Sequence, residues 1–188
     1  AYHPKENIGN ANNIKSKVAL GFKRLSIIDL SKNGHQPMCD DSQQFWIVFN
    51  GEIYNYKDIR NELLALNHNF KSDTDTEVVL KAYIQWGEKA LQKFNGMFAF
   101  AVFDVRKNEF FFARDRIGIK PLYYIKNKDR VIFGSTIKSI IDSNLYKPEI
   151  NWEGLHQNFT FSIAQRPNTC FTNIVALQPA HFLKLNIT

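Results

Sequence analysis

The sequence predicts a mixed α+β or layered α/β domain, because helix-like and strand-like segments follow one another without internal repeats. Apolar residues recur at helical spacing in 55–68 and 76–94. From 97 to 105 the period changes to two, and short polar loops then predict antiparallel hairpins over 97–113 and 122–133. With 16 Phe among its 188 residues, the chain can fill a substantial core. Two facing sheets covered by helices fit this pattern, which does not by itself fix the architecture.

The first third of the chain contains shorter elements. We expect a short buried strand at Val18–Phe22 and a polar loop at 31–44. The continuous apolar run Phe45–Phe49 predicts a strand that is buried on both faces. Asn50-Gly51 follows this run at once and is a strong signal for a tight turn.

The boundaries of the second helix and the later elements are also marked in the sequence. Thr74-x-x-Glu77 is a capping-box pattern at the start of this helix, and Gly87 is expected to end or interrupt it. A short helix is expected at 136–141, and further short strands are expected between 171 and 185.

Composition restricts the kinds of partner. The net charge of +6 comes from scattered Lys and Arg without a zinc-finger, RNP or basic-zipper pattern, so we expect no nucleic-acid partner. No apolar run approaches the roughly 20 residues that span a bilayer, and no signal-peptide pattern opens the chain, so we expect no membrane partner. Cys39 and Cys170 lack metal-ligand spacing and the density of a disulfide framework, which favours no metal site and a cytoplasmic location.

Common catalytic signatures are absent, including the nucleophile elbow, the Gly-Lys-Ser/Thr phosphate loop and the His-Glu-x-x-His motif. Four polar segments instead stand at the ends of apolar elements, where a rigid scaffold displays functional groups. These segments are residues 24–29, 50–55, 72–77 and 114–121. The last combines Arg, Asp, Gly and Pro at close spacing, and we interpret it as a buried, salt-bridged turn rather than a catalytic segment.

Six motifs in order closely resemble the N-terminal glutaminase domain of asparagine synthetases, a class II glutamine amidotransferase of the N-terminal-nucleophile hydrolase superfamily. They are GFKRLSIIDLS, GHQPM, FNGEIYNY, SDTDTEVVL, NGMFAFAVFD and ARDRIGIKPLYY. The resemblance implies an α+β fold, a four-layer αββα sandwich of two antiparallel sheets between helices. It also implies that glutamine is hydrolysed to glutamate and ammonia. An ATP- and Mg²⁺-dependent synthetase domain would then use the ammonia to amidate aspartate.

The resemblance also implies a set of site residues. Hydrolysis of an amide through a thioester creates an oxyanion that needs two hydrogen-bond donors. Asn50 and Gly51 match the oxyanion hole of the family, and the alternative from the residues alone is a simple tight turn. Arg24 matches the clamp for the glutamine α-carboxylate, or is otherwise a surface residue beside Lys23. The backbone that would line the glutamine pocket belongs to Arg24, Leu25, Ser26, Ile27 and Ile28.

Two acidic residues match the family's partners of the glutamine ammonium group, Glu52 and Asp75. Asp75 also has a simpler interpretation, because an acidic side chain in the first turn of a helix is favoured by the helix dipole.

The sequence departs from the family pattern at its beginning. Members need Cys as the first residue of the mature chain, since its thiol is the nucleophile, and neither Cys39 nor Cys170 matches that position. We expect that residues 1–188 are an amidotransferase domain truncated at its N-terminus, and that the synthetase domain, with its ATP and Mg²⁺, is outside this chain. Thr136 and Ala180 also replace the Glu and Gly that are usual in the family, towards the interface with the synthetase domain.

The sequence therefore predicts the glutamine-hydrolysing domain of an asparagine synthetase-type enzyme, with glutamine and its own synthetase domain as partners. A related ligase that amidates another carboxylate, such as a sugar acid, is the alternative enzyme. A non-catalytic glutamine-binding or scaffold domain that has lost its Cys is the alternative from another class. Formation of a homodimer is left open.

Overall fold

The computed structural model describes residues 17–23, 34–128 and 130–187. The strands are β1 (Met38–Cys39), β2 (Phe45–Ile53), β3 (Gly96–Asp104), β4 (Glu109–Arg114), β5 (Tyr123–Lys126), β6 (Val131–Gly134), β7 (Val175–Ala176) and β8 (Phe182–Asn186). The helices are α1 (Tyr56–Ala65), α2 (Asp75–Trp86), α3 (Ala90–Lys93), α4 (Ile137–Ile141) and α5 (Trp152–Phe161), with a 3-10 turn, η3 (Gly87–Lys89).

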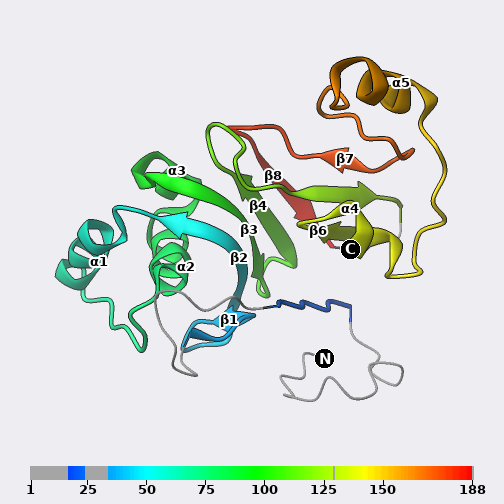
Figure 1. Cartoon of the computed structure of the whole chain (residues 1–188). Helices are drawn as coiled ribbons and strands as arrows, with labels where there is room; N and C mark the ends of the chain where they lie inside the picture. The colour runs from blue at the N-terminus through cyan, green and yellow to red at the C-terminus, as the bar shows by residue number, and fades with distance from the viewer. Residues whose placement is uncertain (1–16, 24–33, 129, 188) are drawn as a thin grey trace.

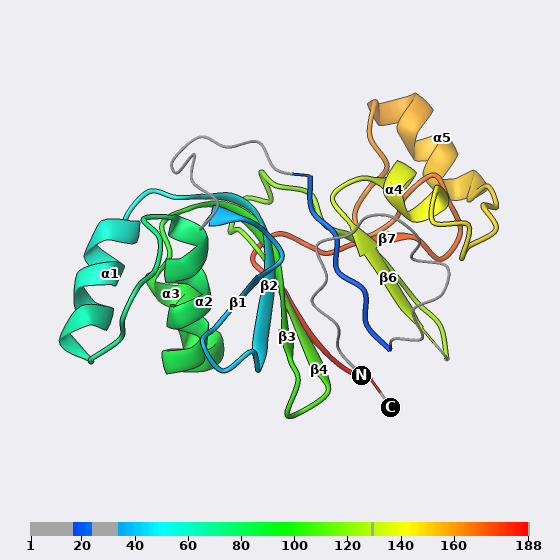
Figure 2. The ribbon, with the colours of Figure 1, turned by 90° about the horizontal axis from the view of Figure 1, so that it is seen from below.

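These elements form four layers within the described part of the chain (Figure 1). One sheet has the order β1-β2-β3-β4-β8 and the other has the order β6-β5-β7, and all their pairings are antiparallel. Helices α1, α2 and α3 cover one face of the larger sheet, and α4 and α5 lie beyond the smaller sheet (Figures 1 and 2). The αββα class implied by the resemblance is confirmed.

Strand β3 separates two apolar cores and shapes the space between the sheets. Its large side chains Phe98, Phe100 and Val102 face the helices, as the period of two predicts. The opposite face carries Ala99 and Ala101, which belong to the core between the sheets. Because alanine is small, this face leaves room for a cavity where a row of large side chains would fill the gap.

The segment Val18–Phe22 differs from the prediction, since it is not a strand. Figure 2 shows residues 17–23 as an extended stretch that runs between the two sheets. Val18 and Leu20 are partly buried and pack by their side chains against the core between the sheets. The apolar residues of this segment therefore indicate packing against the core. They do not require the hydrogen-bonded pairing of a strand.

Helix α2 begins and ends as expected, but its capping box is only half formed. The Thr74 hydroxyl accepts a hydrogen bond from the Glu77 N–H at 3.2 Å, which caps the helix. The Glu77 carboxylate accepts hydrogen bonds from the N–H groups of Lys71 and Ser72 instead of returning to Thr74. Gly87, at φ +60°, ends the helix.

The turn after β4 buries Arg114 and Asp115 but exposes Ile117 and Ile119, so it is only partly buried, and the predicted salt bridge is wrong. The Arg114 guanidinium donates to the carbonyl oxygens of Gly118, Lys120 and Leu177 at 2.6–2.7 Å. The Asp115 carboxylate accepts from five backbone N–H groups, those of Phe98, Ile117, Gly118, Ile119 and Lys120. No ion pair joins Arg114 to Asp115 in this fully described turn. Each buried charge is compensated by backbone dipoles.

Candidate functional site

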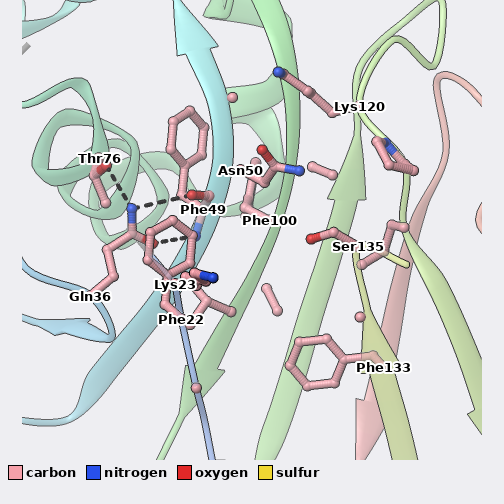
Figure 3. Close-up of a pocket in the computed structure, with 18 of the residues that line it drawn as sticks. Phe22, Lys23, Gln36, Phe49, Asn50, Thr76, Phe100, Lys120, Phe133 and Ser135 are labelled. Carbon is pink, nitrogen blue, oxygen red and sulfur yellow. Dashed lines mark hydrogen bonds between the residues drawn. The ribbon is translucent and has the colours of Figure 1, made fainter. Parts of the chain in front are cut away.

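A cavity of about 700 Å³ lies at one end of the space between the sheets (Figure 3). One wall consists of 48–52 in β2, 74–76 at the start of α2, and 99–101 in β3. The facing wall consists of 120–122 and residues of the β6–α4 connection, Phe133 to Thr136 and Ser139. Polar groups from three of the four segments singled out in the sequence therefore meet in one place.

Asn50 and Gly51 lie inside β2, so the predicted tight turn is wrong. Asn50 is paired with Ala99, and Gly51 is paired with Phe98. The glycine is needed for close packing, because a Cβ atom on Gly51 would lie 2.2 Å from the carbonyl oxygen of Met97. The Asn-Gly pair therefore marks a close approach of two strands and not a turn, since a glycine within a strand often stands where another backbone comes close.

The Gly51 N–H points away from β3, along the opposite edge of β2. Backbone groups of an antiparallel strand alternate between its two sides. Phe49 and Ile53 direct their N–H groups to the edge remote from β3, where Gln36 Oε1 and Asp75 Oδ2 accept them at 2.6 and 3.0 Å. Gly51 lies midway between them, and no acceptor among the described residues takes its N–H. Among the described residues, this edge thus leaves one backbone donor available to a ligand.

The side chain of Asn50 faces the cavity between the sheets (Figure 3). Its carboxamide forms no hydrogen bond within the part of the chain that the structure describes. Asn50 and Gly51 are consecutive, so a carboxamide and a backbone N–H, both without a hydrogen-bond partner among the described residues, stand next to each other at the cavity wall. Two adjacent donors of this kind suit an oxygen atom that gains negative charge.

Asp75 is the first residue of α2 and is 5% exposed. Its carboxylate receives the Ile53 N–H, which ties the start of the helix to the edge of β2. Burial raises the pKa of Asp75 above its usual value, and the nearby charge of Glu52 adds to this effect. Asp75 and Glu52 both line the cavity. A buried carboxylate with a raised pKa beside a second carboxylate attracts a cation, because a cation relieves both the desolvation and the repulsion.

The predicted residues Arg24, Leu25, Ser26, Ile27 and Ile28 lie outside the described residues. Their neighbour in the sequence is described, and Figure 3 shows Lys23 at the cavity. The structure thus brings together Asn50, Gly51, Glu52 and Asp75, and it leaves the position of the carboxylate clamp as a prediction.

Gln36 is a site residue that sequence reasoning missed. Its side-chain amide pairs with both backbone groups of Phe49, and its Nε2 also donates to Thr76 Oγ1 at 3.3 Å (Figure 3). It thereby replaces a neighbouring strand and joins β2 to α2 at the cavity. The signal was its place in the motif GHQPM, within a segment that was predicted only as a polar loop.

Neither cysteine lines the cavity. Cys39 lies in β1, where burial raises the pKa of its thiol, and Cys170 lies in the segment after α5. Within the described residues, no group of three or more His, Cys, Asp or Glu side chains is placed to hold a metal ion. No helix in the same residues is long and apolar enough to cross a membrane.

The sequence matches the glutamine amidotransferase domain family over residues 9–188. The chain belongs to this family. Two asparagine synthetases [glutamine-hydrolyzing] of Bacillus subtilis strain 168, numbers 3 and 1, are 41% and 42% identical to it. The alignments cover 88% and 86% of this amidotransferase chain, but 27% and 25% of the two relatives. The chain therefore spans about a quarter of the length of these relatives.

Other relatives bear different names. Amidase chry2 of Gibberella zeae is 34% identical, over 88% of this chain and 24% of that protein. Among solved structures, the glutamine phosphoribosylpyrophosphate amidotransferase of B. subtilis has a TM-score of 0.51 at 17% identity, over 80% of this chain and 30% of that one. A structure titled as the allosteric regulatory enzyme of purine biosynthesis has a TM-score of 0.56 at 18% identity, over 82% and 30%. At such identities these structures support the fold of the amidotransferase domain alone.

Proposed function

We propose that residues 1–188 form part of the glutamine-hydrolysing domain of an asparagine synthetase. In this function glutamine is converted to glutamate and ammonia, and the ammonia is passed to a synthetase domain that amidates aspartate at the expense of ATP. The observation that carries the proposal is the meeting of Asn50, Gly51, Glu52 and Asp75 at one cavity in a chain of the amidotransferase family.

Asn50 and Gly51 are proposed to form the oxyanion hole. Attack of a thiolate on the carboxamide carbon of glutamine turns the carbonyl oxygen into an oxyanion. The Asn50 carboxamide and the Gly51 N–H are adjacent donors, and no described group occupies either of them. Because they are held by the β2–β3 pairing before glutamine enters, they need little reorganisation as the charge develops.

The charged ends of glutamine are assigned to the remaining residues. Glu52 and Asp75 are proposed to bind the α-ammonium group, whose positive charge offsets the cost of two carboxylates in one cavity. Arg24 is proposed to bind the α-carboxylate with its planar guanidinium, and the backbone of residues 24–28 is proposed to line the pocket. These two sets would fix both ends of a free amino acid.

The nucleophile is proposed to be the thiol of a cysteine at the mature N-terminus of the whole protein. Its sulfur forms a bond to the carboxamide carbon, the amide nitrogen takes up a proton and leaves as ammonia, and water then hydrolyses the thioester to glutamate. The α-amino group of that cysteine would act as the base. Cys39 and Cys170 are free but lie away from the cavity.

The second half of the reaction is assigned to a synthetase domain in the same polypeptide. The curated relatives extend well beyond the matched quarter, and their names describe asparagine synthetases. ATP and Mg²⁺ would bind there, since the described residues here provide no cluster of metal ligands. A cytoplasmic location completes the proposal, and the two free thiols support it.

The test is a product assay with the full-length protein. We expect glutamate to appear when glutamine is added, and asparagine to appear when aspartate and ATP are also present. An absence of glutamate release, with glutamine still bound in calorimetry, would favour a non-catalytic binding domain instead. Glutamate release without asparagine, but with amidation of another carboxylate such as a sugar acid, would leave the hydrolytic site in place and change the acceptor.

A further inference from the structure

Helix α5 and the residues that follow it present a set of large apolar side chains to solvent. Trp152 is 73% exposed, Phe159 is 80%, Phe161 is 58% and Ile163 is 54%. Helical spacing places Trp152 and Phe159 on one side of α5, and we call these two residues the α5 face. Single exposed apolar residues are common on proteins, but a group of this kind marks a site of interaction.

The outward direction of the α5 face follows from how the helix is attached. Trp152 and Phe159 are seven residues apart, so they lie on one side of the helix, two turns from each other. The inward side holds Gly154, where a Cβ atom would lie 2.1 Å from the carbonyl oxygen of Thr169. The Asn151 side chain caps the helix by accepting the Gly154 N–H and donates to the same carbonyl. The helix is therefore held by a glycine and by polar contacts, and its aromatic side is left uncovered.

The composition of this segment is that of an interface core. Glu153 is the only charged residue between 150 and 163, whereas 22% of the whole chain is charged. The buried centres of protein interfaces are depleted in charged residues and enriched in Trp and Phe. A surface exposed to solvent throughout the life of the protein would more often carry Lys or Glu at these positions.

The α5 face lies on the side of the molecule that forms the second wall of the cavity. Figures 1 and 2 both place α5 in the half of the molecule that carries the smaller sheet, at the opposite end from α1. The connection into α4 contributes Ser135, Thr136 and Ser139 to the cavity. A partner seated on α5 would therefore pack on the half of the molecule that forms this wall of the cavity.

We propose that the α5 face is the surface on which the remainder of the full-length polypeptide packs, the part that corresponds to the rest of the asparagine synthetase relatives. The relatives are about four times as long as the matched region, which provides an occupant in the same chain. A permanent contact within one polypeptide also explains why the face has kept so little charge. The identity of this occupant as a synthetase domain rests on the proposed function.

The first test is hydroxyl-radical footprinting of the full-length protein, read by mass spectrometry and corrected for intrinsic reactivity. Trp152 and Phe159 should be oxidised roughly fivefold or more slowly than their exposure here implies, because an interface core excludes water. Leu64 on α1, which is 48% exposed, should be oxidised at the rate of an exposed residue. Full oxidation of Trp152 and Phe159 would overturn the proposal. Protection that disappears on dilution would also overturn it, since the face would then belong to a second copy.

The second test compares two double variants of the full-length protein. Trp152→Ser with Phe159→Ser should leave glutamate release unchanged within about twofold, because these exposed side chains support no fold contact. Glutamine-dependent amidation should fall roughly tenfold, since ammonia is lost when the two parts separate. Leu64→Ser with Leu66→Ser, which replaces two exposed apolar residues at the end of α1 and at its C-cap, should change neither rate.

Measuring both glutamate release and glutamine-dependent amidation distinguishes failure of the α5 proposal from failure of the proposed function. Unchanged amidation in the Trp152/Phe159 variant, with glutamate release intact, would overturn the α5 proposal and leave the proposed function standing. Absence of glutamate release in the unmodified protein would overturn the proposed function, while footprinting would still report whether α5 is covered.

Discussion

Asp75, which we propose to bind the ammonium group of glutamine, carries a cost to stability. Burial raises its pKa, so the ionised carboxylate is penalised in the folded chain. Since the folded pKa lies above the unfolded one, the favourable contribution of this group exists at low pH and is lost as pH rises through the folded pKa. A bound ammonium group would offset the penalty that the empty site carries near neutral pH.

We predict that Asp75→Asn weakens glutamine binding roughly tenfold, because one charge-assisted contact with the ammonium group is lost. The free energy of unfolding near pH 7 should stay the same or rise, because the buried charge is removed while an amide oxygen can still accept the Ile53 N–H. Calorimetry with glutamine and urea unfolding measure the two effects. Asp58→Asn, in the first turn of α1 and exposed, is the matched control and should not affect binding. Wild-type affinity in the Asp75 variant would remove Asp75 from the ammonium site.

Asn50 and Gly51 were selected as site residues from the sequence, but their conformation was not predicted correctly. The resemblance selected them as donors, and the structure places them together at the cavity with no described partner. Their local conformation was predicted wrongly. Asn-Gly is common in tight turns, but in this chain the strand continues through both residues. Here β2 continues to Ile53, since its register with β3 runs on to Gly96. That register depends on a segment more than forty residues later, which local propensity does not contain.

At the level of elements, the β2–β3 pair depends on two glycines, each of which faces the backbone of the opposite strand. A Cβ atom on Gly51 would lie 2.2 Å from Met97 O, and one on Gly96 would lie 2.2 Å from Glu52 O. Both contacts involve backbone, which cannot move aside without disturbing the ladder. The strands that carry the candidate oxyanion hole are therefore packed more closely than side chains would allow.

Gly51→Ala should lower the free energy of unfolding by roughly 3 kcal/mol, because overpacking against a fixed backbone forces the strands apart. Urea unfolding followed by circular dichroism measures the change. Gly21→Ala is the control for stability, since a Cβ atom there meets nothing within 4 Å. If both variants unfold at the same urea concentration, Gly51 is not under the steric restriction described.

The turn between β4 and β5 is a second element that is fixed by its backbone contacts. Asp115 is 1% exposed and receives five N–H groups. Burial tends to raise its pKa, but hydrogen bonds from Lys120, Ile119, Phe98 and Gly118 outweigh burial and hold the pKa below its usual value. A lowered pKa means that the stabilisation is present above the unfolded pKa and is lost as pH falls through the folded one.

Asp115→Ala is expected to destabilise the fold by roughly 3 kcal/mol near pH 7, because several buried N–H groups lose their acceptor. The difference from wild type should shrink as the pH falls below the ordinary pKa of Asp, about 4. Thermal unfolding across this pH range tests both statements. Asp73→Ala, whose side chain is 90% exposed, should be nearly neutral. A difference that does not vary with pH would mean that Asp115 acts by its shape rather than its charge.

For the whole molecule, periodicity predicted most strands and helices, and the resemblance supplied the order of the layers. Helix α5 was missed because Trp152 and Phe159 face outward and its one buried residue is Gly154. Periodicity identifies helices that bury an apolar stripe in their own domain, and this helix does not. The salt bridge expected in the 114–121 turn was wrong for a related reason. Neighbouring opposite charges suggest a pair, whereas each charge here is surrounded by backbone groups, which come from the loop itself and from Leu177 and Phe98.

In the proposed function, the cavity beside β2 is a glutamine site whose oxyanion donors are Asn50 and Gly51. In the full-length protein, Asn50→Ala should lower the kcat of glutamate release by roughly 10²–10³ with a smaller change in KM, because the donor binds the developing oxyanion more tightly than the substrate carbonyl. Amidation with added ammonia should proceed at the wild-type rate, since it bypasses glutamine cleavage. If both activities fall together, or if kcat for glutamate release is unchanged, Asn50 is not an oxyanion donor but a structural residue of β2.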